Sequence, residues 1–210
     1  MREMVDETRL EQAIDRSEIR DVIAKSIIAR DSGLWKELVE CYHPDATLTS
    51  SWFSGGPAQF LERSAEMKIA RHEGETQKHM TGNHWIELNG PRALAECDLI
   101  LYQRRLISGV ELDFTTWSRR LHMMEKRDGR WKIRNRTAIY EKDRMDPHNP
   151  NDVPAGLFEA MDLSRYPSAI RYHCWRNDMA GFPPVGNICI KGSEREKDVR
   201  EEARKWLAAR

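Results

Sequence analysis

The spacing of apolar residues near the start of the chain predicts a long amphipathic helix. Between Leu10 and Arg30, apolar residues recur at steps of three and four, which places them on one helical face: Ile14, Ile19, Val22, Ile23, Ile27 and Ile28. Asp31-Ser32-Gly33 then interrupts the pattern. The apolar residues from Leu34 to Tyr42 indicate a short second helix, which we expect His43-Pro44-Asp45 to end.

The next segment combines strand-forming residues with a turn. Residues 47–53 favour a strand, because they are rich in threonine and aromatic side chains. Gly55-Gly56-Pro57 is typical of a turn. Proline also suits the first turn of a helix, where its missing N–H group has no helical partner. We therefore expect a third helix from Pro57 to about Arg71.

From Thr76 onward the pattern changes to long strand-like segments. They cover residues 79–88, 93–106, 110–125 and 130–141, and the sequences between them are typical of turns. Consecutive strands joined in this way form an antiparallel meander. Helices followed by such a sheet indicate an α+β fold, in which the helices cover the concave side of a bent sheet and leave a pocket.

The chain after Asp146 has a different composition. Six prolines interrupt its short apolar segments, at positions 147, 150, 154, 167, 183 and 184. We therefore expect residues 1–145 to form one domain, and residues 146–210 to form a C-terminal extension that packs on this domain or on a neighbouring subunit. Residues 193–210 have the pattern of a charged helix with an apolar side that includes Val199 and Leu207.

The balance of charged residues argues against a polyanionic partner. The 210 residues include 34 Lys and Arg against 34 Asp and Glu, so no net field attracts nucleic acid or an anionic membrane. No apolar run approaches the roughly 20 residues that cross a bilayer, and the first residues lack the apolar core of a signal peptide. We therefore expect a cytoplasmic protein without a membrane or nucleic-acid partner.

Cysteine spacing and the missing motifs narrow the chemistry to ordinary side chains. Four cysteines stand far apart without a Cys-x-x-Cys pair, which predicts reduced and mostly buried thiols: Cys41, Cys97, Cys174 and Cys189. The sequence has no glycine-rich phosphate loop, no nucleophile-elbow serine and no His-Glu-x-x-His motif. We expect neither a metal ion nor an organic cofactor.

Three polar residues are candidates for chemistry, and each also has a simple structural explanation. Asp31 follows the apolar face of the first helix and could point into the pocket, but a turn aspartate often caps the next helix. His79 opens the first long strand, where a single histidine is more often structural. Strict alternation in the last strand places Arg134 and Arg136 on one face and Ile133 on the other, and an exposed arginine ladder explains this pattern equally well.

Several spaced motifs together resemble the SnoaL-like branch of the nuclear transport factor 2 superfamily. They are Asp31, Trp35, His43-Pro44-Asp45-Ala46, HMTGN at 79–83 and EKRDGRWKIRNR at 125–136. The resemblance covers residues 10–142 and implies a cone-shaped fold with a curved antiparallel sheet wrapped around N-terminal helices. Members include scytalone dehydratase, bile acid dehydratase, a hexachlorocyclohexane dehydrochlorinase, polyketide cyclases and lyases of lignin-derived aromatic dimers.

The same resemblance implies roles for the three candidates. In eliminating enzymes of the family, an aspartate at the end of the first helix holds a strand histidine, and in the dehydrochlorinase an arginine on the last strand assists. Asp31, His79 and Arg136 match these positions, whereas Ser26 stands where the dehydrochlorinase has a lysine. A neutral imidazole can accept a proton, a carboxylate can fix its tautomer and a guanidinium can stabilise an oxyanion. We expect Asp31 and His79 to meet within hydrogen-bonding distance in a largely apolar cavity.

The resemblance implies a cofactor-independent lyase that removes water, or a one-carbon fragment such as formaldehyde, from a hydroxylated, aromatic, lignin-derived molecule. The candidate substrate-binding residues are Trp52, Tyr140, Tyr102, Ile27 and Asn83. For the three aromatic residues, a place in the ordinary core is the alternative. Two other functions stay open: a non-catalytic ligand-binding or structural subunit, like the small subunit of ring-hydroxylating dioxygenases, and an isomerase or cyclase using the same base. We also expect a homo-oligomer, with a trimer narrowly preferred over a dimer.

Overall fold

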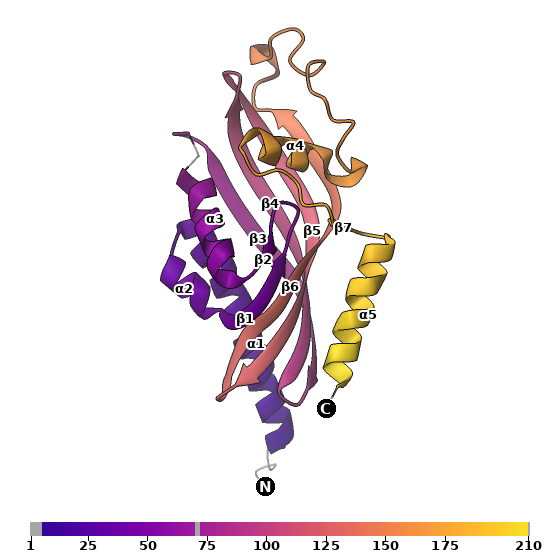
Figure 1. Cartoon of the computed structure of the whole chain (residues 1–210). Coiled ribbons are helices and arrows are strands. Elements are labelled where there is room, and N and C mark those ends of the chain that lie inside the picture. Colours follow the sequence, from indigo (N-terminus) through magenta and orange to yellow (C-terminus); the bar gives the residue numbers. More distant parts are fainter. Residues whose placement is uncertain (1–5, 70–71, 210) are drawn as a thin grey trace.

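A curved seven-stranded sheet forms the centre of the computed structural model, which describes residues 6–69 and 72–209 (Figure 1). The strands are β1 (Tyr42–Thr49), β2 (Ser54–Gly55), β3 (Thr76–Asn89), β4 (Arg92–Ile107), β5 (Val110–Arg127), β6 (Arg130–Pro147) and β7 (Cys189–Ile190). Their order is β2-β1-β6-β5-β4-β3, and β7 pairs with β6. The predicted α+β class and the antiparallel meander from β3 to β6 are confirmed.

The connection between the second helix and the first strand differs from the prediction. α2 (Trp35–Glu40) ends before His43-Pro44-Asp45, and these three residues lie inside β1, which runs parallel to β6. The N–H group of Ile133 donates a 2.8 Å hydrogen bond to the carbonyl of Cys41, and a ring nitrogen of His43 lies 2.9 Å from the carbonyl oxygen of Glu125. The prediction was wrong because these bonds to distant strands outweigh the local turn signal.

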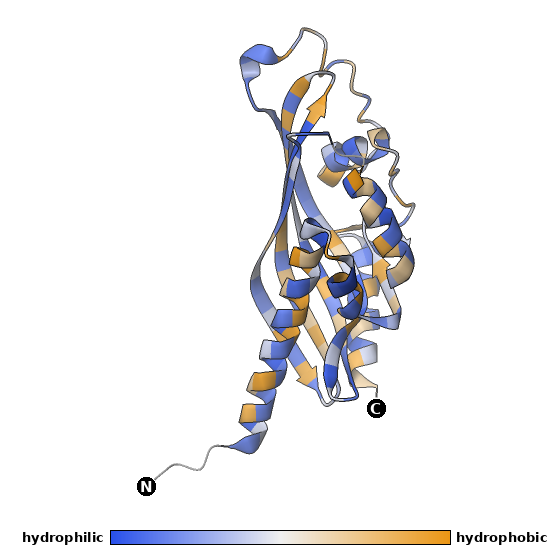
Figure 2. Ribbon diagram, turned by 90° about the vertical axis from the view of Figure 1, so that its left-hand side faces the viewer, coloured by the Kyte–Doolittle hydropathy of each residue, from blue (hydrophilic) through white to orange (hydrophobic). Residues whose placement is uncertain are grey.

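The N-terminal helices α1 (Glu7–Ser32), α2 and α3 (Pro57–Ile69) cover part of the inner face of the sheet (Figure 1). α1 is capped by the side chain of Asp6 and ends at Gly33, whose φ of 77° suits glycine. The predicted end of α3 near Arg71 lies outside the described residues. Figure 2 shows polar and apolar residues alternating along α1 and the long strands. The apolar sides of these elements pack into one core, which includes Ile19, Ile23, Leu38, Leu48 and Phe60.

A β-bulge in β6 changes which side chains face the helices. Ile133 and Asn135 pair with successive residues of β5, so Arg134 between them has no partner of its own. Ile133 therefore faces the helical core, on the same side as Arg136, which faces the cavity described below. Arg134 instead donates a hydrogen bond to the backbone carbonyl of Asp45. The strict alternation that grouped Arg134 with Arg136 was wrong, because one extra residue shifts the side-chain phase.

The C-terminal extension contacts both faces of the sheet. Two short 3-10 turns, Pro150–Asp152 and Ser168–Ile170, precede α4 (Arg171–Met179), which packs on the inner face against Phe114 and Tyr140. α5 (Glu194–Ala208) lies on the outer face (Figure 1) and packs there through an apolar side that includes Val199, Ala203 and Leu207. The predicted charged helix is confirmed over these residues, and its predicted end at position 210 lies outside the described part of the chain.

All four cysteines are buried and free, in agreement with the prediction. Burial raises the pKa of Cys97 and Cys174 to about 12, so both remain thiols at neutral pH. Across residues 6–69 and 72–209, no helix is long and apolar enough to cross a membrane.

Candidate active site

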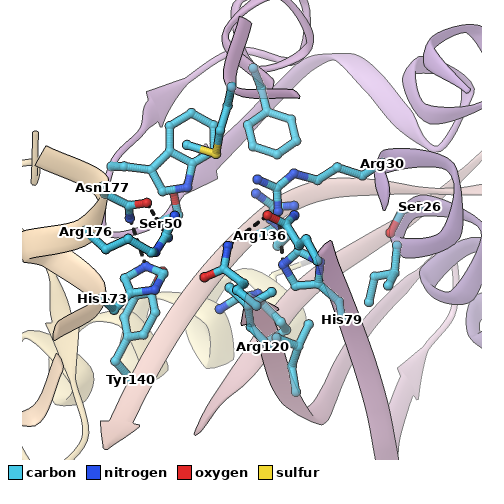
Figure 3. A pocket seen from close by; sticks show the side chains of 18 of the residues that line it. Ser26, Arg30, Ser50, His79, Arg120, Arg136, Tyr140, His173, Arg176 and Asn177 are labelled. Carbon is cyan, nitrogen blue, oxygen red and sulfur yellow. Dashed lines mark hydrogen bonds between the residues drawn. The ribbon is translucent and has the colours of Figure 1, made fainter. Parts of the chain in front are cut away.

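A cavity, part of it open to solvent, lies between the helices and the inner face of the sheet (Figure 3). Its walls come from α1, α3, α4 and strands β3 to β6, so segments far apart in the sequence meet there. Trp52, Phe60 and Leu99 belong to its apolar part, but four arginines and three histidines also line it. The expectation of a largely apolar cavity was therefore wrong.

Asp31 and His79 form two hydrogen bonds at one end of this cavity. Oδ1 of Asp31 lies 2.7 Å from Nδ1 of His79, and Oδ2 accepts a 2.7 Å bond from the His79 backbone N–H group. The carboxylate lies in the last turn of α1, and His79 pairs with Leu101, so both side chains of that pair share the inner face of the sheet. The predicted approach of Asp31 and His79 is confirmed, while their catalytic roles stay predictions.

The second ring nitrogen of His79 faces Arg30. Nη1 of Arg30 lies 3.1 Å from Nε2 of His79. Because a guanidinium can only donate, Nε2 must accept this bond, and Nδ1 must carry the proton that is donated to Asp31. The imidazole is therefore neutral, and its basic lone pair is directed at a cation.

Burial agrees with a neutral imidazole and a charged carboxylate. Burial is the main cause that lowers the pKa of His79 to about 4; the charges of Arg30 and Arg120 act in the same direction, and Asp31 opposes them. For Asp31, burial raises the pKa, but the hydrogen bonds from His79 outweigh it, and the pKa is lowered. The resting pair is a carboxylate next to a neutral base.

Arg30, Arg120 and Arg136 reach the cavity from α1, β5 and β6 (Figure 3). The guanidinium carbons of Arg30 and Arg136 lie 5.3 and 4.5 Å from the centre of the Phe60 ring, and that of Arg120 lies 5.7 Å from the centre of the Tyr140 ring. Within residues 6–69 and 72–209, none of these three guanidiniums has a carboxylate oxygen within 4 Å. Their positive charge is therefore not balanced by direct ion pairs.

Burial and the charge of a neighbouring arginine both lower the pKa values of Arg30 and Arg120. Burial lowers the pKa of Arg30 to about 10, and the charge of Arg136 adds to this effect. Burial also lowers the pKa of Arg120, and Arg136 again acts in the same direction. Both groups remain protonated near neutral pH. Arg30, Arg120 and Arg136 therefore concentrate positive charge close to the carboxylate of Asp31.

The opposite end of the cavity is completed by the C-terminal extension (Figure 3). Nε2 of His173 lies 2.7 Å from Oγ of Ser51 and 3.1 Å from Nδ2 of Asn177, and its Nδ1 lies 3.2 Å from Oγ1 of Thr116. The Tyr140 hydroxyl donates a 3.1 Å bond to Oγ of Ser51 and accepts a 3.0 Å bond from the Ser51 N–H group. α4 thus adds a buried polar network to the site.

Three of the candidate substrate-binding residues lie in the cavity wall, namely Ile27, Trp52 and Tyr140. Trp52 stacks on Phe60 with ring centres 5.8 Å apart and an interplanar angle of 28°. These contacts give the cavity a flat aromatic surface beside the arginines. What the three residues do toward a substrate stays a prediction.

The other two candidates lie outside the cavity. Tyr102 is 42% exposed, because the alternation that turns Leu101 inward turns Tyr102 to the outer face of β4. Asn83 occupies a bulge in β3 with a φ of 44°, and its side chain donates a 2.9 Å hydrogen bond to Asp98. Placing Tyr102 and Asn83 in the pocket was therefore wrong.

Sequence reasoning missed several charged residues of the site. Ser26 and Arg30 are four residues apart, so they share a helical face with the neighbouring Ile27, and this spacing could have revealed Arg30. In a strand, residues two positions apart face the same side, so Arg120 lies on the same face as His122, and this spacing could have indicated that Arg120 faces the cavity. The α4 residues gave no signal, because nothing local in the sequence says which face of the sheet an extension covers.

Among the described residues, no three His, Cys, Asp or Glu side chains gather as metal ligands would.

Sequence comparison relates the chain to fungal proteins. Residues 11–137 match the family model of the SnoaL-like domain. A PEP2-like protein of Fusarium vanettenii is 29% identical over 205 residues, which cover 92% of this chain and 86% of that protein. Pea pathogenicity protein 2 of the same fungus is 26% identical over 208 residues, which cover 93% and 86% of the two chains.

Solved structures share the fold. A type 2 hexachlorocyclohexane dehydrochlorinase (LinA) matches with a TM-score of 0.58 at 18% identity, over 71% of this chain and 99% of its own. A candidate scytalone dehydratase from Novosphingobium aromaticivorans matches with a TM-score of 0.56 at 14% identity, over 63% and 88% of the two chains. Because the family model matches more than half of the sequence, the chain belongs to the SnoaL-like family, and its fold is of the nuclear transport factor 2 type.

Proposed function

We propose that this protein is a cofactor-independent lyase in which Asp31 and His79 remove a proton from a small hydroxylated molecule. The observation that carries the proposal is the 2.7 Å contact between Oδ1 of Asp31 and Nδ1 of His79, whose ring lines the cavity. A neutral imidazole with its tautomer fixed by a carboxylate is suited to be a general base. Two structural neighbours carry the names of eliminating enzymes, a dehydrochlorinase and a candidate dehydratase, which supports this class of reaction.

In the proposed dehydration, Nε2 of His79 takes a proton from the carbon next to the one that bears the hydroxyl group. The C–H electron pair becomes the new C=C bond as the C–O bond breaks. The imidazolium, stabilised by Asp31, returns its proton to the departing hydroxide, so water leaves and neutral His79 is restored. Arg136 is assigned to the oxygen on which negative charge develops.

Loss of formaldehyde is the second form that the same elimination can take. Nε2 of His79 then takes the proton of a terminal hydroxymethyl group, the C–C bond breaks, and the oxygen and its carbon leave as formaldehyde. This form requires a para-phenol that has first lost its phenolic proton and its benzylic hydroxyl as water, which leaves a quinone methide. The electron pair released from the C–C bond then forms a C=C bond conjugated with the ring, and the quinone methide becomes a phenolate. The phenolate takes the proton from the imidazolium, so neutral His79 is restored. The aromatic surface formed by Trp52 and Phe60 favours a flat substrate of this kind.

One observation favours a second candidate function, ligand binding without turnover. Nε2 of His79 already accepts a hydrogen bond from Arg30, and a pKa of about 4 makes it a weak base in the resting site. If a ligand binds without displacing Arg30, the lone pair on Nε2 stays occupied and the protein can bind the ligand but cannot use His79 as a base. An isomerase or cyclase would use the same base and therefore needs the same displacement.

Screening combined with a histidine variant separates these functions. The wild-type protein is incubated with hydroxylated aromatic compounds; a new conjugated C=C bond is followed by absorbance, and formaldehyde is trapped chemically. We expect His79→Ala to lower kcat by on the order of 10²-fold or more, with ligand binding retained. His148→Ala is the matched control, because His148 is exposed and is not among the residues that line the cavity.

Circular dichroism first establishes that each variant is folded. A folded His79→Ala protein that turns over at the wild-type rate would contradict the proposal, because the proton would then need another acceptor. Ligand binding by a wild-type protein that eliminates nothing across the whole panel would favour the binding function instead.

A further inference from the structure

We propose that the ligand of this cavity is a small aromatic carboxylate, and that Arg30, Arg120 and Arg136 bind its anionic group. The inference goes beyond the proposed elimination, which requires only a hydroxylated molecule. It follows from the positive charge of the cavity, from buried arginine N–H donors that have no acceptor among the described residues, and from the aromatic surface beside them. Only its consequence for the reactivity of His79, argued below, rests on the proposed function.

Arg30, Arg120 and Arg136 lack, among the described residues, the acidic partners that several other arginines of the sheet have. Arg104 donates two hydrogen bonds of 2.7 and 2.8 Å to the carboxylate of Asp113, as surface arginines of this protein typically do. No comparable acceptor faces Arg30, Arg120 or Arg136 within the described residues. Burying cations without anions costs free energy, which a bound anion would offset.

Individual donor atoms of the cluster also lack acceptors. Nε of Arg30 and Nε of Arg136 are buried and have no hydrogen-bond partner among residues 6–69 and 72–209. The side chain of Arg120 is only 8% exposed, and its hydrogen-bond partners are hydroxyl groups, with a long 3.3 Å bond to Ser118 and an interaction with Tyr140. Buried donors normally find acceptors. A carboxylate accepts two parallel bonds from one guanidinium fork and still has lone pairs for a second.

The surface next to the cations indicates the rest of the ligand. Phe60 lies against the guanidiniums of both Arg30 and Arg136, and Trp52 stacks on the same ring. A ligand whose anion lies at the arginines therefore has its body against aromatic side chains. This combination suits an aromatic carboxylate better than a free inorganic phosphate ion, which has no apolar part to bury.

Binding of the carboxylate also frees the base. Nη1 of Arg30 donates to Nε2 of His79 at 3.1 Å in the empty cavity. A hydrogen bond from a guanidinium to a carboxylate is charged at both ends and is stronger than one to a neutral imidazole. The incoming anion thus draws Arg30 away from His79, and the lone pair on Nε2 becomes available for the substrate proton.

The ionisable groups around His79 determine how its proton affinity responds. They come from α1, α3, β5, β6 and α4 and comprise Arg30, Asp31, Lys68, Arg120, His122, Arg136, Tyr140, His173 and Arg176. Arg30 and Arg120 are the cations that lower the pKa of His79. A bound carboxylate neutralises part of this field, so the pKa of His79 rises when the ligand binds.

The binding test uses benzoate, cinnamate and phenylacetate, each beside its uncharged primary amide, with inorganic phosphate as a further ligand. Calorimetry and thermal shift on the full chain should show at least one carboxylate binding about tenfold or more tightly than its amide. Arg136→Met should remove this preference, Arg136→Lys should weaken it because the planar fork is lost, and Arg144→Met should leave it unchanged. Arg144 is a matched control on the same strand, since its side chain is 68% exposed.

The inference is overturned if no carboxylate exceeds its amide, if inorganic phosphate binds more tightly than all three carboxylates, or if Arg144→Met weakens binding as much as Arg136→Met. Circular dichroism excludes variants that fail to fold. Arg30→Met is the second cavity variant, and it should also abolish the preference, so the test does not depend on one substitution.

Histidine resonances test the consequence for His79. Titration followed by NMR should give a higher pKa for His79 with a saturating carboxylate than without it. Arg30→Met should raise the pKa of His79 without ligand, because the cation at Nε2 is gone. An unchanged pKa in both experiments would contradict the displacement of Arg30.

These measurements distinguish failure of the inference from failure of the proposed function. A protein that binds carboxylates through Arg136 but eliminates nothing has the anion site without the lyase activity. A protein that eliminates water from neutral substrates with no carboxylate preference is a lyase without this anion site.

Discussion

Nη1 of Arg30 lies 3.1 Å from Nε2 of His79, on the side of the ring opposite the nitrogen that contacts Asp31. Two consecutive residues of α1 therefore hold the two nitrogens of one imidazole, one as donor and one as acceptor. This arrangement fixes the tautomer and keeps the ring neutral. It also keeps the lone pair on Nε2 of His79 hydrogen-bonded until another acceptor competes for the guanidinium of Arg30.

Asp31→Asn should damage turnover much more than binding. An amide replaces one of the two carboxylate oxygens by an NH2 donor. One of the positions that accept from Nδ1 and from the backbone N–H of His79 would then hold a donor instead. The ring is then driven toward the wrong tautomer, and kcat should fall on the order of 10³-fold. Steady-state kinetics and calorimetry measure the two effects, and a variant with wild-type kcat would show that Asp31 is only structural.

The pH dependence of the reaction should differ between the free and the liganded protein. His79 must be neutral to act, and its pKa in the empty cavity is about 4. The acidic limb of kcat/KM, which reports the free protein, should therefore lie near pH 4. The limb of kcat should lie at higher pH, because a bound anion raises the pKa of His79. Identical limbs in the two profiles would contradict this coupling.

Acidification should destabilise the fold at pH values above those at which carboxylates with ordinary pKa values titrate. Burial lowers the pKa of His79 to about 4 and that of His122 to about 3, and the pKa of His173 is also lowered. Below about pH 6.5 the unfolded chain binds protons that the folded chain does not, so stability falls as pH falls. His79 and His122 should each cost about 1.6 kcal/mol between pH 6.5 and 5, and His173 acts in the same direction.

Asp143 acts in the opposite direction, because burial raises its pKa to about 6 and the folded state then takes up a proton as the pH falls. Its effect offsets about one histidine. Urea unfolding at pH 7.5 and pH 5.0 measures the net change, and an equal or higher midpoint at pH 5.0 would refute the prediction.

Tyr140→Phe should destabilise the protein by about 1–3 kcal/mol. The hydroxyl accepts a hydrogen bond from the buried N–H group of Ser51 and donates one to its Oγ, and the variant leaves that N–H group without this acceptor. Tyr102→Phe is the matched control and should change stability little, because Tyr102 is 42% exposed. Urea midpoints compare the two, and equal midpoints would mean that water replaces the hydroxyl.

Homo-oligomerisation, with a trimer preferred, stays a prediction of the sequence. The outer face of β3 and β4 exposes Met80, Trp85 and Tyr102, of which Trp85 is 74% exposed. Apolar groups gathered on one face often mark an interface. Light scattering at micromolar concentration should give a multiple of 24.6 kDa, and Met80→Glu with Trp85→Glu should lower it. A monomeric wild-type protein would refute the prediction.

The sequence alone determined the elements whose signals are local. The apolar repeat from Ile14 to Ile28 predicts α1, and Gly33 marks its end, because helical periodicity and a left-handed cap depend on neighbouring residues. Turn residues between alternating segments predict the meander in the same way. The Asp31–His79 pair was accessible through the resemblance to a family, since neither residue stands out on its own.

Only the tertiary structure decided what surrounds that pair. The bulge at Arg134 sets which side of β6 faces the cavity, and a one-residue shift in register reverses every later side chain. The parallel pairing of β1 with β6 and the docking of α4 bring together residues more than 80 positions apart, such as Ser51 and His173. The unpaired positive charge beside His79 arises from this convergence of α1, β5 and β6. It is invisible in a chain whose total charge is zero.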